Sequence, residues 1–197
     1  MHLIILFALL QGFTEFIPVS SQGHLILFNN FFNINIMSNI TVLEANVIAH
    51  AGSLVAVSLY YRKEIFSLFI SLRHIVRPDI DKNSTLLIQL IIATFPILLC
   101  GFFFSKYFNY NDKSLLLIIG ITSISFGIVL FFFDRFCLTV KGGQEMNFLT
   151  SLCVGIFQCL ALIPGVSRSG SIIILLRFCG YNRNFAVFFS NLLSVPV

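Results

Sequence analysis

Charged residues are scarce in this sequence. Only 10% of its 197 residues are Asp, Glu, Lys or Arg, whereas 57% are hydrophobic. Soluble globular proteins carry about 25% charged residues, so the composition excludes an ordinary soluble domain. Three stretches contain no charge at all, namely residues 83–105, 114–133 and 146–167. Because a helix needs about 20 apolar residues to cross the hydrocarbon core of a bilayer, these stretches predict membrane-spanning helices.

The sequence also lacks the residue patterns of several other protein classes. Its five cysteines are odd in number, lie mostly in apolar segments and have no zinc-site spacing: Cys100, Cys137, Cys153, Cys159 and Cys179. This excludes a disulfide framework and favours small packing residues. Basic residues are not clustered among aromatic ones, so no nucleic-acid partner is expected. Five of the twelve lie in the 62–82 loop instead, which the positive-inside rule makes cytoplasmic.

What is present is a series of apolar segments. They cover approximately residues 1–10, 42–61, 84–105, 114–133, 147–163 and 184–197, with two shorter mixed segments at 16–32 and 166–180. The pattern predicts an all-α polytopic membrane protein with a single transmembrane domain over residues 1–197. Alternating spans place the 134–146 loop in the cytoplasm with the 62–82 loop, and the 106–113 loop outside. The segment Ile65–Ile75 is expected to form a helix at the membrane interface.

An internal repeat relates the two mixed segments. Residues 16–27, FIPVSSQGHLIL, align with residues 162–174, LIPGVSRSGSIII, when Gly165 is treated as an insertion. Each copy has the pattern of an apolar helix, a proline break, a small polar turn and a second short apolar helix. Irregular polar backbone survives in a membrane only where it lines a protein cavity. Paired breaks therefore predict a site between two repeats, of which the first covers about 1–133 and the second about 147–197.

Few ionisable residues lie in or beside the apolar runs, and each is a functional candidate because burying a charge in hydrocarbon costs several kcal/mol. They are Glu15, His24, Glu44, His50 and Arg168. Three of them, Glu15, His24 and Arg168, fall in or next to the repeated segments. Glu44 is expected at the interface. His50 would serve either as a partner of the site or, as we prefer, in a hydrogen bond between helices.

The first repeated segment carries a candidate nucleophile. Ser21 and His24 have the spacing of a hydroxyl activated by a neighbouring base, and Ser20 precedes them. Helix capping is the simpler interpretation of the serines, above all for Ser20. Gln11 and Glu15 are four residues apart and so share one helix face. That pair would bind a divalent cation, orient a water molecule, or simply line a helix contact.

The second repeated segment carries a candidate phosphate site. Ser167, Arg168, Ser169 and Gly170 offer hydroxyls, a permanent cation and free backbone N–H groups at a helix start. The alternative for Arg168 is contact with lipid headgroups, and Arg177 and Arg183 are expected to meet headgroups or the outer charge of a substrate. Combined, the two segments predict phosphoryl transfer from an amphiphile, with charge neutralised by Arg168 and by a metal if one binds.

These residues resemble the signatures of a known family. The segment from Gln11 to His24, QGFTEFIPVSSQGH, and the segment 164–170, PGVSRSG, are similar to the two motifs of bacterial undecaprenyl-diphosphate phosphatases of the bacitracin-resistance type. The likeness continues through 50–57, HAGSLVAV, and 191–196, NLLSVP. It implies inverted repeats with re-entrant broken helices, and hydrolysis of undecaprenyl diphosphate to undecaprenyl phosphate and phosphate, which recycles the lipid carrier of peptidoglycan synthesis.

The resemblance also implies the site and its surroundings. Glu15, Ser21, His24 and Arg168 take the catalytic places, with Ser21 as nucleophile and Glu15 as a candidate metal ligand. Gln11, Ser20, Ser167, Ser169 and Gly170 take the phosphate-binding places. Gln11 stands where many members carry Glu, which weakens a two-carboxylate metal site. The expected cofactor is a divalent cation, Mg²⁺ or Ca²⁺. The expected location is the bacterial plasma (inner) membrane, with the site on the outer side.

Members of this family continue beyond the position at which this sequence ends, so a truncated or split product is expected. Its partners would be the polyprenyl diphosphate, membrane lipids, and either a second copy of the chain or a complementing C-terminal fragment. Two other functions remain to be compared. Acid-phosphatase-like lipid phosphatases need a further His after the Ser-Arg element, and none follows Arg168. A transporter or flippase for an anionic headgroup would need Arg168 and the helix ends but not Ser21 chemistry.

Overall fold

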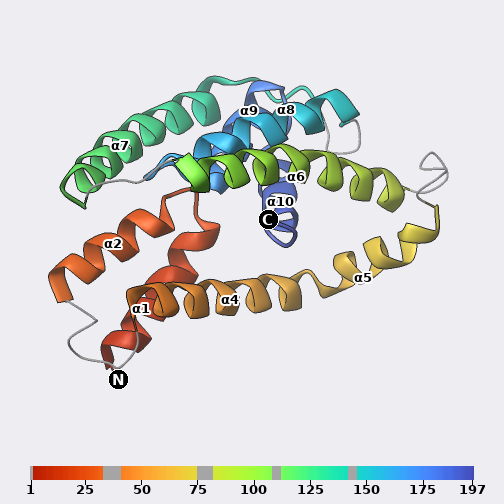
Figure 1. Ribbon diagram of the computed structural model, residues 1–197. Coiled ribbons are helices and arrows are strands. Elements are labelled where there is room, and N and C mark those ends of the chain that lie inside the picture. Colours follow the sequence, from red (N-terminus) through yellow and green to blue (C-terminus); the bar gives the residue numbers. More distant parts are fainter. Residues whose placement is uncertain (1, 33–40, 75–81, 108–111, 142–145) are drawn as a thin grey trace.

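The computed structural model describes residues 2–32, 41–74, 82–107, 112–141 and 146–197 (Figure 1). Within these ranges the named elements are all helices, which confirms the predicted all-α fold. They are α1 (His2–Phe16), α2 (Ser21–Phe32), α4 (Val42–Tyr60), α5 (Arg62–Ser71), α6 (Lys82–Tyr107), α7 (Asp112–Phe136), α8 (Phe148–Gln158), α9 (Arg168–Phe178) and α10 (Arg183–Leu193), with 3₁₀ turns η1 (Leu72–His74) and η4 (Cys159–Leu162).

Among the described residues, three helices are long and apolar enough to cross a membrane. Their spans are Leu43–Tyr60, Lys82–Phe104 and Ser114–Phe136, with mean hydropathies of 1.2, 2.4 and 2.6. Large apolar side chains point outward along them, for example Phe102 and Leu117. Such exposure is unfavourable in water and ordinary against lipid tails. The chain is therefore a multi-pass membrane protein.

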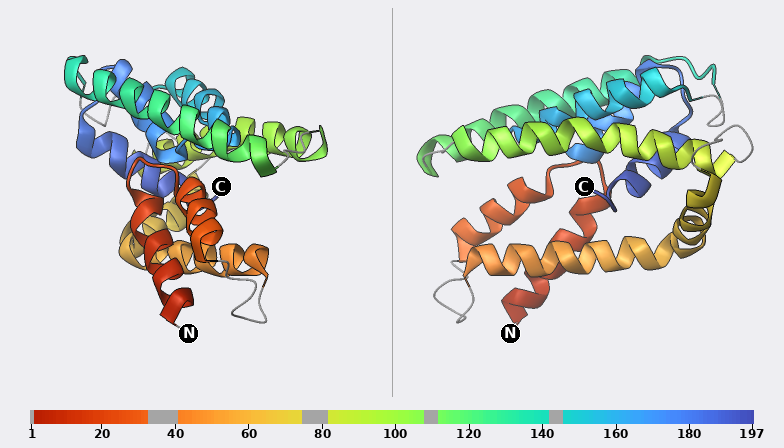
Figure 2. Two further views of the ribbon diagram at one scale, coloured as in Figure 1. Left: turned by 90° about the vertical axis from the view of Figure 1, so that its left-hand side faces the viewer. Right: turned by 45° about the vertical axis from the view of Figure 1, so that its right-hand side comes forward.

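The ends of the long helices divide the molecule into two sides. In Figure 2 the end of α4 and the starts of α6 and α8 lie at one end, whereas the end of α6 and the start of α7 lie at the other. Helix α5 follows α4 directly and takes the place of the predicted interfacial helix, although it begins at Arg62 and ends at Ser71. At the start of α4, Glu44 closes a capping box with Thr41, so its carboxylate stabilises a helix end.

Two helical hairpins form the centre of the molecule. One consists of α1 and α2, and the other consists of α8, η4 and α9. Their tips have matching caps: Ser20 Oγ accepts from Gly23 N at 3.2 Å, and Ser167 Oγ accepts from Gly170 N at 3.2 Å. The aligned serines of the sequence repeat thus begin equivalent helices, because a hydroxyl at the N-cap satisfies an otherwise unpaired N–H group.

The tip of the second hairpin is anchored on α7. Gly165 has a φ of +93°, and a Cβ at this position would lie 2.1 Å from Thr122 Oγ1. Thr122 Oγ1 donates to the Pro164 carbonyl at 2.6 Å, and Ser123 Oγ donates to the Gly165 carbonyl at 3.1 Å. The inserted glycine therefore permits both the left-handed turn and the close approach to α7.

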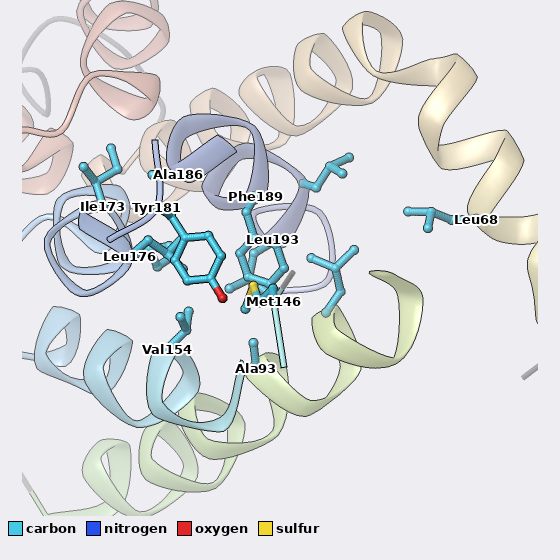
Figure 3. Close-up of a cluster of buried hydrophobic side chains, with 13 residues drawn as sticks. Leu68, Ala93, Met146, Val154, Ile173, Leu176, Tyr181, Ala186, Phe189 and Leu193 are labelled. Atoms are coloured by element: carbon cyan, nitrogen blue, oxygen red, sulfur yellow. The ribbon is translucent and has the colours of Figure 1, made fainter. Parts of the chain in front are cut away.

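The main hydrophobic core surrounds α9 and α10. Figure 3 shows Tyr181 at its centre, facing Leu176, Val154 and Phe189. Most of α9 is buried, and α8 packs closely on α6, where a Cβ on Gly155 would lie 2.6 Å from the Ala93 carbonyl oxygen. A smaller cluster of Phe7, Leu25 and Phe28 holds α1 and α2 together. Each cluster thus stabilises one of the two hairpins, since Val154 of α8 packs with residues of α9 in the larger one.

The sequence suggested that Arg177 would meet lipid headgroups or the outer charge of a substrate, but the structure shows that it is buried inside the protein. It is only 3% exposed and donates to the carbonyl oxygens of Tyr181 (2.8 Å), Cys137 (2.7 Å) and Asp134 (3.3 Å). These carbonyls follow α9 or end α7, where a helix leaves acceptors unpaired. Arg183 is exposed but pairs with the Asp134 carboxylate at 2.6 Å. All five cysteines are free, but none is fully buried: Cys100 and Cys153 are exposed and the other three are half-buried, so the structure does not support their interpretation as core packing residues.

Candidate functional site

The Glu15 carboxylate joins the two hairpins. Its Oε2 accepts hydrogen bonds from Gln11 Nε2 and from Ser21 Oγ, both at 2.8 Å. Its Oε1 lies 3.3 Å from Arg168 Nη2. The Glu15 side chain is 15% exposed and that of Arg168 is 23% exposed, so water screens the pair only partly. Of the four predicted catalytic residues, the structure brings three together: Glu15, Ser21 and Arg168.

The hydroxyls of the second tip lie beside this pair. Ser169 Oγ donates to the Ile17 carbonyl of the first tip at 3.4 Å, and it lies 3.1 Å from Ser167 Oγ. A Cβ on Gly170 would lie 3.5 Å from the Pro18 carbonyl oxygen. The two tips are therefore in direct contact, although they are far apart in the sequence.

A polar pocket of about 450 Å³ lies between the tips. Its walls come from α1, α2, the first half of α4 and the second hairpin. The lining residues are Glu15, Val19, Ser20, Ser21, Gln22, Leu25, Leu43, Asn46, His50, Ala161, Val166, Ser167, Arg168 and Ser169. An adjoining pocket of about 310 Å³ shares Glu15, His50 and Arg168 with it and extends past Phe16, Ser53 and Leu54 to residues 194–197.

Two helix starts face the polar pocket. Ser21 and Gln22 open α2, and Arg168 and Ser169 open α9; all four line the pocket. The first N–H groups of a helix have no partner within the helix, and its dipole favours negative charge there. With the Arg168 guanidinium added, the pocket is suited to an anion such as a phosphate group.

His24 does not pair with Ser21, contrary to the spacing argument. Its Nδ1 lies 2.7 Å from the Ser20 carbonyl oxygen, which can only accept, so this nitrogen carries the proton. The ring is exposed and is not part of the polar pocket. Ser21, the first residue of α2, points back to α1 instead and donates to Glu15. The group that would take the Ser21 proton is therefore the Glu15 carboxylate.

Two predicted phosphate ligands lie behind the pocket wall. Gln11 is fully buried and donates to Glu15, so it orients the carboxylate. Gly170 is buried and its N–H is bonded to Ser167. The other three predicted ligands, Ser20, Ser167 and Ser169, line the pocket.

Two residues of α4 join the site that the sequence did not assign to it. His50 Nε2 lies 3.6 Å from Glu15 Oε2, and Asn46 lines the pocket one turn earlier. The Asn46 Oδ1 atom is buried and has no hydrogen-bond partner among the residues that the structure describes. The sequence did signal His50, through its apolar position and the family likeness over 50–57, but we preferred a helix contact for it; Asn46 had no such signal.

The donor set suits a hard cation only in part. Among the residues that the structure describes, no three His, Cys, Asp or Glu side chains gather into a metal cluster. The pocket does offer the Glu15 carboxylate, serine hydroxyls and the unpaired Asn46 oxygen. Oxygen ligands suit Mg²⁺ and Ca²⁺, and Mg²⁺ is commonly held by one or two carboxylates together with substrate phosphates. The residues therefore fit a cation that a phosphate-bearing substrate helps to bind.

Fold and site together define a class: a multi-pass membrane protein with a polar pocket, suited to an anion, between the tips of two helical hairpins. Comparison with known sequences is more specific. The family model described as "Bacitracin resistance protein BacA" matches residues 4–197, and the chain belongs to this BacA family.

Curated relatives cover nearly the whole chain. A protein of Aliivibrio salmonicida named undecaprenyl-diphosphatase is 38% identical over 191 residues, which are 96% of this chain and 70% of that protein. Proteins with the same name from Jannaschia sp. and Saccharophagus degradans are each 36% identical, cover 98% and 100% of this chain, and are themselves covered over 71% and 72% of their length.

Proposed function

We propose that this chain is an undecaprenyl-diphosphatase, a hydrolase that converts undecaprenyl diphosphate to undecaprenyl phosphate and phosphate. One observation carries the proposal: the Ser21 hydroxyl donates to a carboxylate at the mouth of an anion pocket that also holds Arg168. A nucleophile, its base and a phosphate-binding cation thus lie side by side. Family membership and the names of the relatives favour the same reaction.

The first chemical step uses Ser21. Its Oγ attacks the terminal phosphorus of the diphosphate while Glu15 Oε2, at 2.8 Å, takes the hydroxyl proton. The bond from that phosphorus to the bridging oxygen breaks, so undecaprenyl phosphate leaves and a phosphoserine remains. Arg168 and the starts of α2 and α9 stabilise the negative charge on the transferring group.

The second step returns the enzyme to its starting state. Glu15 first releases the Ser21 proton to solvent. A water molecule then attacks the phosphoserine while Glu15 takes its proton, the bond from phosphorus to Ser21 Oγ breaks, and phosphate leaves as Ser21 Oγ takes this proton from Glu15. Gln11 keeps the Glu15 carboxylate in position through both steps because it is buried and hydrogen-bonded to it. A divalent cation would be held by Glu15 and the Asn46 oxygen together with the diphosphate, and would supply further charge neutralisation.

The proposed location is the plasma membrane, with the polar pocket open to the outer side. Leu43, in the first turn of α4, lines the pocket, whereas the basic residues Arg62 and Lys63 follow the other end of this helix. Since basic loops stay in the cytoplasm, the start of α4 lies outside. A substrate headgroup would enter from that side.

The test is phosphate release from undecaprenyl diphosphate by protein in detergent or proteoliposomes. Wild-type protein is expected to release phosphate, and Ser21→Ala and Arg168→Ala are each expected to lower kcat at least about 100-fold. Ser169→Ala serves as the matched serine control, with a smaller loss. A transporter would release no phosphate, and its transport activity would survive the Ser21→Ala change. The proposal is therefore contradicted if the wild-type protein releases no phosphate, or if the Ser21→Ala variant releases it at the wild-type rate.

A further inference from the structure

One ring nitrogen of His50 faces the Glu15 carboxylate, and the other is held by the main chain. His50 Nδ1 lies 2.9 Å from the Asn46 carbonyl oxygen, which can only accept, so this nitrogen carries the proton. In the neutral ring Nε2 is then an acceptor, and it lies 3.6 Å from Glu15 Oε2, a second acceptor. A charge-assisted hydrogen bond would be about 2.7–2.9 Å long. Two acceptors thus face each other with no hydrogen bond between them.

The surroundings of His50 match those of histidines that bind metal ions. Such a histidine nearly always donates its other N–H to a backbone carbonyl, a carboxylate or water, which fixes the tautomer. A ligating carboxylate is in turn hydrogen-bonded, and Glu15 accepts from Gln11 and Ser21. An ion about 2.1 Å from each of two ligands holds them about 3.0–3.4 Å apart. The observed 3.6 Å therefore requires only a small shift of either side chain.

A third donor lies one helical turn away. Asn46 and His50 share one face of α4, and both line the polar pocket together with Glu15. The Asn46 Oδ1 atom is buried and has no partner among the described residues, whereas a buried amide oxygen normally has one. Asn46 therefore holds the His50 ring with its main-chain oxygen and leaves its side-chain oxygen available for a ligand.

We propose that His50 Nε2 is a ligand of the divalent cation, together with the Glu15 carboxylate and Asn46 Oδ1. The proposal rests on the proposed function for the substrate diphosphate, which supplies further oxygens to the same ion. The nitrogen determines which metal is preferred. Ca²⁺ takes oxygen ligands, whereas imidazole is a common ligand of first-row transition ions. The site therefore binds a transition ion such as Mn²⁺ in preference to Ca²⁺.

The experiment uses Mn²⁺ with inorganic phosphate as the probe, on detergent-solubilised protein without a histidine tag. Pulsed electron paramagnetic resonance detects a nitrogen atom bonded to Mn²⁺. The wild-type protein is expected to show this nitrogen signal, and His50→Gln is expected to lose it. The matched control is His24→Gln, because the His24 ring also places Nδ1 against a backbone carbonyl but lies outside the pocket. This control should keep the signal.

Binding affinity gives a second measurement, independent of turnover. His50→Gln is expected to raise the Kd for Mn²⁺ at least about tenfold and to change the Kd for Ca²⁺ less than about twofold, since only the nitrogen donor is lost. Asn46→Asp replaces the amide oxygen by a carboxylate, so it should lower the Kd for Mn²⁺ without altering the nitrogen signal.

The remaining outcomes count against the site. Wild-type protein that binds no Mn²⁺, or binds it without a nitrogen signal, would overturn the proposal. So would a signal that survives His50→Gln or disappears in His24→Gln. Phosphate release from undecaprenyl diphosphate, measured on the same wild-type preparation, tests the proposed function separately. Release without a nitrogen signal refutes the His50 site alone, and a nitrogen signal without release refutes the proposed function alone.

Discussion

Glu15 has one partner on its own helix and three on other helices, and this determines which neighbouring side chains matter for its chemistry. Ser21 and Gln11 donate to Oε2, Arg168 pairs with Oε1, and His50 Nε2 lies 3.6 Å away. The Glu15 carboxylate can accept the proton of the Ser21 hydroxyl that donates to it. A neutral amide of the same shape keeps the packing and loses this capacity.

Replacing Glu15 and replacing His24 should therefore have very different effects. Glu15→Gln is expected to lower kcat about 10²- to 10⁴-fold, the usual contribution of a general base. His24→Asn should retain at least roughly a tenth of the activity, because the ring faces the Ser20 carbonyl outside the pocket. Steady-state phosphate release from both variants measures this. If both variants lose the same amount of phosphate-release activity, His24 is the base that activates Ser21, as the spacing suggested.

The sequence alone predicts about half of this site at residue scale. Glu15, Ser21 and Arg168 are recognisable because polar residues in apolar surroundings are rare and lie in two copies of one motif. The direction in which a side chain leaves a helix start is not encoded in spacing, so the pairing of Ser21 with His24 was wrong. His50 and Asn46 lie outside the two repeated segments, and the packing of α4 on α1 brings them to the pocket.

At the scale of elements, the second hairpin depends on its turn. Gly165 combines a positive φ with close contact to α7, and Thr122 and Ser123 bind the turn carbonyls. Because Arg168 follows three residues later, any shift of the turn moves the guanidinium. The repeat alignment shows that Gly165 is inserted in the second copy. It does not show why, because the reason is a tertiary contact between this turn and α7.

Gly165→Ala should consequently destabilise the protein and displace Arg168. The left-handed backbone costs roughly 1–2 kcal/mol for a residue with a Cβ, and overlap with Thr122 adds to this. The expected result is a Tm several degrees lower, with reduced phosphate release, by thermal unfolding in detergent. The control is Gly120→Ala in α7, where an added Cβ meets nothing within 4 Å. A Gly165→Ala protein as stable as this control would contradict the account of the turn.

Arg177 and Arg183 offer a second comparison between elements. Arg177→Met removes donors from buried carbonyls at the end of α7 and beyond α9, each loss costing about 1–3 kcal/mol. Arg183→Gln breaks an exposed ion pair, which water screens and which therefore contributes little to stability. Unfolding by denaturant should show a much larger effect for Arg177→Met. Similar effects for both would mean that Arg177 contributes little beyond a surface charge.

At the scale of the whole molecule, the helix ends define two sides that labelling can separate. In a background free of native cysteines, Lys63→Cys should react with an impermeant thiol reagent only in inverted vesicles. Ser114→Cys, at the start of the span Ser114–Phe136, should react only in intact spheroplasts. The reverse pattern would place the polar pocket on the cytoplasmic side. The sequence predicts the membrane-spanning helices from hydropathy and the side of each loop from its basic residues. The arrangement of the whole molecule in the membrane is therefore the level that the sequence predicts best.

The contact between the two tips also has a consequence in time. Glu15 and Arg168 are 153 residues apart, and ribosomes add about 5–20 residues per second, so the carboxylate enters the membrane roughly 10–30 s before its partner exists. During that interval Gln11 and Ser21, both within six residues, can already satisfy Oε2. The nascent chain thus carries a protected but inactive half-site. Catalysis begins only when synthesis has passed the second hairpin and Arg168 docks against the first.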